Sequence, residues 1–281
     1  MGSSNVAVIV VTHNSEKHLD KCMQCLNSQT LQASQIVLVD SGSADRTYLN
    51  KFASMAGVDV VLAEKDIGFC KGNNIGLTKI TPDVDFILFI NPDAFAMPTF
   101  LEEAVAFMLL DSQKTCGALT GTTAGYSIES DFPTGLYDTT GVFCTWWGCW
   151  YDRGQGEAVN SQLYSSIEEI PAICGAVYFC RRIAVRDVML PGEELFDSRF
   201  YMYKEDIDLS LRLRAHGWKL MFVPTVKSFH CRGWNSNRKS MPKKMRLHSA
   251  YNELTIHWRQ KWMVPTFYSG LKYWAVKCFN L

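Results

Sequence analysis

The chain of 281 residues is 47% hydrophobic and 20% charged, so it can bury a sizeable core and lies at the upper end of the size of a single domain. No apolar run approaches the ~20 residues of a membrane-spanning helix. Ten irregularly spaced cysteines, with no secretory segment before them, favour a reducing cytosol over a disulfide-stabilised secreted fold.

The formal net charge is zero but is unevenly distributed. Residues 209–281 contain 14 Lys and Arg against one acidic residue and carry +13, whereas residues 1–208 contain 14 basic and 27 acidic residues and carry −13. We therefore expect the C-terminal part of the chain to meet an anionic partner.

Apolar, β-branched runs recur along the first third of the chain and predict parallel strands. They are Val6–Thr12, Gln35–Val39, Val58–Leu62 and the run that begins at Val84. Helical patterns separate them, so the sequence predicts an α/β fold with a mainly parallel sheet flanked by helices. Ligands of such sheets bind beyond the carboxyl ends of the strands.

The stretch Val84–Phe95 ends its apolar run in Asn91-Pro92-Asp93. A carboxylate at a strand end can hold Mg²⁺ or Mn²⁺, whose other ligands are water and substrate phosphate oxygens. Pro92 stiffens the turn and gives Asp93 a defined direction. The alternative is that these residues only form the turn that ends the strand.

Two other loops follow predicted strands and carry polar residues. The segment from Asp40 through Ser41 and Ser43 is rich in small polar groups and suits the base and ribose of a nucleotide. The segment Gly68–Gly76 includes Lys71 and Asn74 and opens a helix, so it suits phosphate. Neither loop has the spacing of a P-loop or of a dinucleotide-binding motif.

Residues 121–170 are rich in Gly, Thr and aromatic side chains and predict a functional insertion. Trp146, Trp147 and Asp152 are candidate acceptor or sugar contacts, because exposed aromatic rings stack on sugar faces. The alternative is that the aromatic residues form the core of the insertion. Gly175 follows in an apolar setting and is a further candidate for acceptor binding.

Glu205, Asp206 and Asp208 stand at the start of a helical pattern. One of them can act as a general base that takes a proton from an acceptor hydroxyl, although acidic residues also cap helices without any catalytic role. Two short strands are predicted on either side of Pro224, and the second leads into His230, a candidate metal ligand or a structural histidine.

Residues 243–262 have helical spacing, and aromatic and basic residues alternate from there to the C-terminus. This composition predicts a segment that lies on an anionic membrane surface. A helix packed on its own domain is the alternative. Nucleic acid is a weaker explanation for the basic charge, because no nucleic-acid-binding module is present.

Taken together, the ordered motifs resemble those of family 2 glycosyltransferases, which have the GT-A nucleotide-sugar fold, and in particular the bacterial rhamnosyltransferase-like branch. The similarity runs from Val6 to about Trp234 and rests on VVTHN, VDSGSADRT, GFCKGNNIG, FINPDAF, DRGQGE, CGAVYFCRR, FDSRFYMYKEDIDLSLRLRAHGW and SFH. It implies a glycosyltransferase domain at 1–240, with a nucleotide-binding half at about 1–120 and an acceptor-binding half at about 121–240. Residues 241–281 would then form a helical, membrane-associating extension.

The resemblance also implies roles for individual residues. Asp40 would contact the nucleotide base, with Thr12 and Asn14 beside it. Asp93 would bind Mg²⁺ or Mn²⁺ with His230 as the second protein ligand, and Asp206, next to Glu205, would be the catalytic base.

The implied reaction is an inverting transfer from a nucleotide-diphosphate sugar, with dTDP-rhamnose favoured, to a glycan or lipid-linked saccharide on the cytoplasmic face of the membrane. The site departs from the family pattern at Asn91, which stands where the D-x-D motif has its first Asp. A glycan-binding pseudoenzyme is therefore the alternative. A nucleotidyltransferase is disfavoured because no Gly-rich basic loop follows the first strand.

Overall fold

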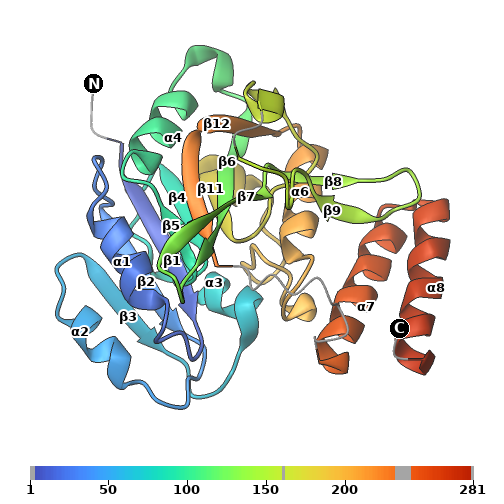
Figure 1. The fold of residues 1–281 in the computed structure, drawn as a ribbon, viewed down its shortest axis with the longest axis horizontal. Coiled ribbons are helices and arrows are strands. Elements are labelled where there is room, and N and C mark those ends of the chain that lie inside the picture. Colours follow the sequence, from blue (N-terminus) through green and yellow to red (C-terminus); the bar gives the residue numbers. More distant parts are fainter. Residues whose placement is uncertain (1–3, 160–161, 232–241, 280–281) are drawn as a thin grey trace.

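The computed structural model describes residues 4–159, 162–231 and 242–279, and its fold is shown in Figure 1. The strands are β1 Val6–Thr12, β2 Gln35–Asp40, β3 Val58–Leu62, β4 Phe86–Ile90, β5 Ala94–Ala96, β6 Cys116–Ser127, β7 Phe132–Thr139, β8 Val142–Cys144, β9 Trp150–Asp152, β10 Glu168–Glu169, β11 Val177–Arg181 and β12 Lys219–His230. The α-helices are α1 Leu19–Asn27, α2 Asn50–Ala53, α3 Gly68–Lys79, α4 Phe100–Met108, α5 Arg182–Asp187, α6 Glu205–Ala215, α7 Lys243–Arg259 and α8 Met263–Phe279.

One central sheet organises the molecule, in the order β10-β12-β6-β11-β4-β1-β2-β3. The strands β4, β1, β2 and β3 are parallel, as predicted. Every residue of β2 and β4 is buried, because helices cover both faces of a parallel sheet. The predicted α/β fold is confirmed, and the carboxyl ends of β1, β2 and β4 meet at one edge.

The sheet becomes mixed beyond β4. Strand β11 runs antiparallel to both β4 and β6, whereas β12 runs parallel to β6. Strand β6 is long, runs to Ser127 and also pairs with β7. The first part of the predicted insertion thus continues the same sheet, whereas β8 and β9 form a separate two-stranded sheet.

The prediction of two short strands around Pro224 is wrong, because Lys219–His230 form the single strand β12. Its pairing with β6 shifts register between Val223 and Lys227, and Pro224 lies in this irregularity. A proline cannot donate a ladder hydrogen bond, so bulges are among the few places where a strand tolerates it.

Helix α3 lies unusually close to the sheet. A Cβ added to Gly72 would come within 2.6 Å of Val11, and one added to Gly76 within 2.5 Å of Ile9. These two glycines therefore serve helix–strand packing, which explains why small residues recur four positions apart.

Helices α7 and α8 pack against each other as a hairpin at one side of the molecule (Figure 1). The turn between β8 and β9 lies on this hairpin, since a Cβ on Gly148 would come within 2.6 Å of Pro265. Within the described ranges no helix is both long and apolar enough to span a membrane.

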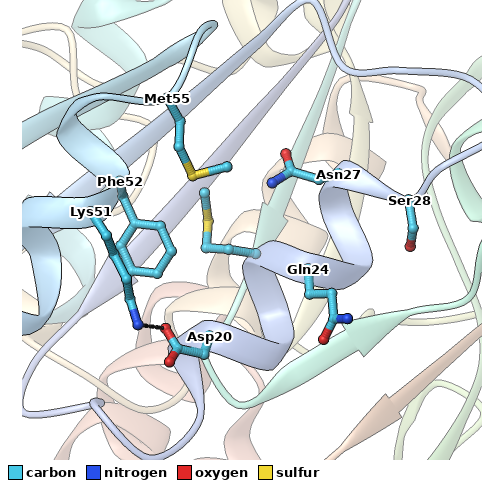
Figure 2. A pocket seen from close by; sticks show the side chains of 8 residues that line it. Asp20, Gln24, Asn27, Ser28, Lys51, Phe52 and Met55 are labelled. Atoms are coloured by element: carbon cyan, nitrogen blue, oxygen red, sulfur yellow. Dashed lines mark ion pairs between the residues drawn. The ribbon is translucent and has the colours of Figure 1, made fainter.

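A groove of about 530 Å³ lies between α1 and α2 (Figure 2). It is lined in part by Met23, Phe52 and Met55, and an ion pair between Lys51 and Asp20 crosses its edge at 2.5 Å. None of the predicted site residues lines it. The candidate chemistry is instead at the strand ends.

Candidate active site

The loops after β1 and β2 are joined by side-chain hydrogen bonds. The hydroxyl of Tyr48 lies 3.1 Å from Thr12 Oγ1 and 3.0 Å from Ser43 Oγ. Ser43 Oγ also accepts from the backbone N–H of Asn14 at 2.8 Å, and Asn14 Oδ1 accepts from Ala44 N at 2.9 Å. The structure thus brings together three of the predicted nucleotide contacts. Tyr48 was not identified from the sequence, because a tyrosine in a short helical turn carries no motif.

Asp40 is fully buried at the end of β2. Its carboxylate accepts from Ser43 N at 3.1 and 3.2 Å and pairs with Arg46 Nε at 2.9 Å. Ser41 Oγ accepts from Gly68 N at 3.1 Å, and so joins this loop to the start of α3. Both side chains therefore shape the nucleotide loop, and the contact of Asp40 with a base stays a prediction.

The two candidates on α3 lie in different environments. The amide of Asn74 is buried, where its Oδ1 accepts from Leu195 N and Phe196 N and its Nδ2 donates to Phe196 O at 2.7 Å. If Asn74 were to contact the nucleotide-sugar donor, these hydrogen bonds would have to break. Lys71 is exposed one turn into the helix, so its side chain can extend toward a phosphate group bound nearby.

Tyr201 joins the loops after β1 and β2 and the start of α3, which together form the predicted nucleotide side of the site, from a distant part of the chain. Its hydroxyl donates to Asp66 Oδ2, and its ring covers Gly68, where an added Cβ would come within 2.5 Å of the ring. Asp66 Oδ1 in turn accepts from Ser41 Oγ at 3.1 Å. Neither Asp66 nor Tyr201 was identified from the sequence.

Asp93 and His230 meet as predicted. Because His230 pairs with Ala94 across β12 and β5, its Nε2 lies 3.4 Å from Asp93 Oδ1. Its Nδ1 lies 2.9 Å from Oδ2 of Asp138, a fully buried residue at the end of β7. Asp138 was missed, because its sequence position, 92 residues before His230, gives no sign of this contact.

The charges at this cluster support one another. Burial opposes protonation of His230, but hydrogen bonds to Asp138 and Asp93 outweigh burial and raise its pKa to about 9. Burial acts to raise the pKa of Asp93, but the hydrogen bond to His230 and the charge of His230 hold this pKa below its usual value. Asp93 and the buried Asp138 thus favour the positively charged imidazole of His230, so the pair of carboxylates already holds a cation between them.

These residues fit a divalent cation. A histidine ligand usually gives its second ring nitrogen to a carboxylate, as His230 does to Asp138, and the side chain of Asp93 is 30% exposed. In the part of the chain that the structure describes, no group of three or more His, Cys, Asp or Glu is arranged to hold an ion. Mg²⁺ and Mn²⁺ need no such set, because phosphate oxygens and water complete their coordination.

The candidate base lies at the N-terminus of α6. Asp206 Oδ2 accepts from the backbone N–H of Gly175 at 2.8 Å, and Asp206 Oδ1 accepts from Ile207 N at 2.8 Å. A Cβ on Gly175 would come within 3.2 Å of Asp206 Cβ. Gly175, predicted as an acceptor contact, therefore holds the carboxylate in place.

The carboxylates around α6 are electrostatically coupled. Burial raises the pKa of Asp206, Asp152 raises it further, and Lys204 and the Gly175 N–H act in the opposite direction. Burial and the charge of Asp206 raise the pKa of Glu205 to about 8. Glu205 Oε2 has no hydrogen-bond partner among the described residues. A base with a raised pKa is better matched to proton transfer near neutral pH.

A short backbone link connects the two parts of the site. Asn91, two residues before Asp93 in the chain, donates its N–H to Ala176 O at 2.9 Å, and Ala176 follows Gly175. Asp152 lies near enough to influence Asp206, but Trp146 and Trp147 lie in the turn between β8 and β9, on the α7–α8 hairpin. Their acceptor contact stays a prediction.

Polar loops at the ends of β1 and β2, the Asp93–His230 pair after β4 and the carboxylates at the start of α6 thus lie together, as the sequence predicts for a transferase of sugar nucleotides. The sequence model of the family "Glycosyl transferase family group 2" matches residues 86–275, and that of "Glycosyl transferase family 2" matches residues 7–132. The chain belongs to glycosyltransferase family 2.

Curated relatives are similar at low identity. The rhamnosyltransferase WbbL of Escherichia coli is 27% identical over 86% of this chain and 89% of its own length. An N-acetylglucosaminyl-diphospho-decaprenol L-rhamnosyltransferase of Mycobacterium tuberculosis is 24% identical over 82% of this chain and 77% of its own. The amylovoran biosynthesis glycosyltransferase AmsE of Erwinia amylovora is 29% identical, but the match spans only 36% of this chain and 40% of that protein.

Solved structures confirm the GT-A fold. GalNAc-T7 with UDP, GalNAc and Mn²⁺ superimposes with a TM-score of 0.68 and 16% identity over 91% of this chain and 48% of that chain. The mannosyltransferase PcManGT of Pyrobaculum calidifontis, in complex with GDP-Man and Mn²⁺, gives 0.61 and 15% identity over 98% of this chain and 70% of that chain.

Proposed function

We propose that this protein is a metal-dependent, inverting glycosyltransferase that moves a sugar from a nucleotide-diphosphate donor to a glycan or lipid-linked saccharide. Rhamnose from dTDP-rhamnose is the favoured donor, on the strength of the rhamnosyltransferase relatives. The observation that carries the proposal is Asp206, held by the Gly175 N–H and connected through Ala176 to the segment that bears Asp93.

The reaction is a single displacement. Asp206 takes the proton of the acceptor hydroxyl, whose oxygen forms a bond to the anomeric carbon on the face opposite the diphosphate. The bond between that carbon and the diphosphate oxygen breaks, and the nucleoside diphosphate leaves with the electron pair. A divalent ion held by Asp93 and His230 would neutralise charge on this leaving group.

The test is Asp206→Asn, assayed by nucleotide release across dTDP-rhamnose, UDP-glucose, UDP-galactose, UDP-N-acetylglucosamine and GDP-mannose, each with and without Mn²⁺ or Mg²⁺. Loss of general base catalysis should lower kcat by about 10²–10⁴. Asp111→Asn is the matched control, because Asp111 is exposed and pairs only with Lys114 among the described residues. NMR of the product should show an inverted anomeric centre.

Near-normal turnover of a folded Asp206→Asn variant would refute the assignment of the base. The glycan-binding pseudoenzyme is favoured by one observation, Asn91 in place of the first D-x-D carboxylate. If no donor is turned over with acceptor present, and nucleotide diphosphates bind without metal dependence, the pseudoenzyme replaces the transferase.

The acceptor side is proposed to rest on an anionic membrane surface. Met263, Phe267, Leu271 and Trp274 are exposed along one face of α8, at spacings of four, four and three residues. The exposed Lys261 and Lys277 flank this stripe, in a C-terminal segment with a charge of +13. Apolar anchors with basic neighbours are typical of helices that lie in the plane of a bilayer.

Sedimentation with vesicles tests this surface. The double variant Phe267→Ser/Trp274→Ser should lose binding to phosphatidylglycerol vesicles, whereas Phe132→Ser, which removes an exposed aromatic ring on β7, should not. Equal binding of the double variant and the wild-type protein would refute the surface. A dimer that the double variant abolishes would assign the stripe to a second copy of the chain.

A further inference from the structure

The loop that leads into α6 has a strained backbone. Met202 N donates to Phe200 O at 2.6 Å around Tyr201, whose φ of 59° and ψ of −59° define a γ-turn of the rare, strained type. Tyr203 and Lys204 follow with φ of 70° and 73°. Residues other than glycine keep such conformations only where their surroundings over-determine them.

This loop joins the two halves of the candidate site. Tyr201 reaches the nucleotide side, where its hydroxyl bonds Asp66 and its carbonyl accepts from Cys70 N at 3.3 Å. Lys204 immediately precedes α6, so the backbone conformation of the loop sets the orientation of the first turn of α6, which bears Asp206. A change in the loop would therefore displace the base and Tyr201 together.

The element that fixes the loop is α7 of the C-terminal hairpin. Asn252 is 1% exposed, and its Nδ2 donates to the carbonyls of Phe200, Met202 and Tyr203 at 3.1, 3.0 and 2.8 Å. The two N–H groups of one amide thus serve three carbonyls of the strained loop, with one hydrogen shared between two of them. This is a donor role, which no apolar or carboxylate side chain of that size can fill.

Other contacts of α7 point to the same region. The ring of His248 lies against that of Tyr201, with centroids 5.8 Å apart. Arg259 Nη1 lies 2.9 Å from Asp197 Oδ2 and 3.2 Å from Asp208 Oδ1, so it neutralises two carboxylates beside α6. Glu253 Oε2 lies 3.8 Å from Lys204 Nζ.

We propose that Asn252 is a positioning residue for the transfer reaction, so that α7 helps to build the active site in addition to packing against α8. The inference rests on the proposed role of Asp206. The exposed stripe lies on α8, whereas the bracing contacts lie on α7, so membrane binding and loop positioning are separable functions of one hairpin.

The test compares Asn252→Asp, Asn252→Gln and Asn252→Ala with the control Thr255→Ala, because within the described residues the Thr255 hydroxyl bonds only Tyr251 O, on the same helix. Kinetics use a soluble acceptor, so that membrane binding does not enter. A misplacement approaching 1 Å can cost about 10² in rate, so we expect Asn252→Asp and Asn252→Ala to lower kcat by about 10–100-fold with little change in donor KM.

The order of the variants separates positioning from packing. Asn252→Gln keeps the amide donors and should recover part of kcat, whereas Asn252→Asp has the size of Asn and should not. A packing role predicts the reverse order and would overturn the proposal, as would wild-type kcat in Asn252→Asp or Asn252→Ala. If Asn252→Asp does not fold, Asn252→Gln against Asn252→Ala decides.

Hydrogen exchange gives a readout that does not depend on turnover. The backbone amides of residues 201–204 should exchange at least about tenfold faster in Asn252→Ala than in the wild-type protein, with unchanged exchange in the central sheet. Unchanged exchange at residues 201–204 would overturn the bracing role. If the wild-type protein transfers no sugar but exchange is faster in Asn252→Ala, the proposed reaction is refuted and the bracing of the loop stands.

Discussion

Replacing Gly175 by Ala tests how closely the base is held. The φ of Gly175 lies outside the left-handed region, so Ala is compatible with the backbone, but its Cβ would lie 3.2 Å from Asp206 Cβ and 3.4 Å from Asp206 Oδ2. The first separation is tighter than an ordinary contact, so Asp206 must move by a few tenths of an ångström. Its hydrogen bond from Gly175 N, now 2.8 Å, lengthens accordingly.

The expected loss follows from this displacement. A misplacement of 1 Å can cost about 10² in rate, so a few tenths of an ångström should lower kcat by roughly 3–10-fold, with donor KM little changed. That loss is much smaller than the one expected for Asp206→Asn. Turnover is measured by release of nucleoside diphosphate at saturating donor.

The matched control is Gly270→Ala. Gly270 lies within α8, and of the atoms in the described parts of the chain an added Cβ would meet only Leu254 Cδ1, at 4.0 Å. This variant should keep wild-type kcat and gain about 0.5–1 kcal/mol of stability, because Ala is the better helix former. Wild-type kcat in a folded Gly175→Ala variant would refute the reasoning that Asp206 is held against residue 175.

Two further predictions concern the charged groups. The pKa of Glu205 is about 8 in the folded protein against 4.5 for the free group, so its favourable contribution to folding is complete below pH 4.5 and is lost as pH rises through 8. Glu205→Gln should therefore melt at a higher temperature than the wild-type protein at about pH 9. An unchanged melting temperature there would contradict the buried location of this carboxyl group. Asp138→Asn keeps the shape but removes the charge behind His230, so Mn²⁺ affinity measured by calorimetry with nucleoside diphosphate present should fall about 10–100-fold, and unchanged affinity would exclude His230 as a ligand.

Local patterns carried the sequence-based prediction of the strands and their polar ends. Buried parallel strands are continuous apolar runs, so the residues that follow them, such as Asp93, can be placed at the edge of the sheet by the hydrophobic pattern alone. The helix that begins at Glu205 was also predicted correctly. Asp93 and His230 were linked only through the family resemblance, and although they lie side by side, their role as metal ligands stays a prediction.

The remaining features depend on contacts between distant residues. Asp138 reaches His230 only because β7 and β12 both pair with β6, and Asn252 is an ordinary helical Asn until α7 is placed against the loop at Phe200. Pro224 was interpreted as a strand break because the sequence does not show that β12 has a bulge there.

The bulge in β12 also limits which changes in chain length this fold tolerates. Gly121 of β6 pairs with Val223 and the next residue of β6 pairs with Lys227, so residues 224–226 are additional on one strand. A deletion within the bulge can be absorbed there, because these residues have no partner on β6. A deletion between Lys227 and His230 would instead move a neighbour of His230 into the position opposite Ala94, since side chains alternate between the two faces of a strand. Homologous chains aligned with a gap between Lys227 and His230 are therefore expected to place a different side chain beside Asp93, even where a histidine remains nearby in the sequence.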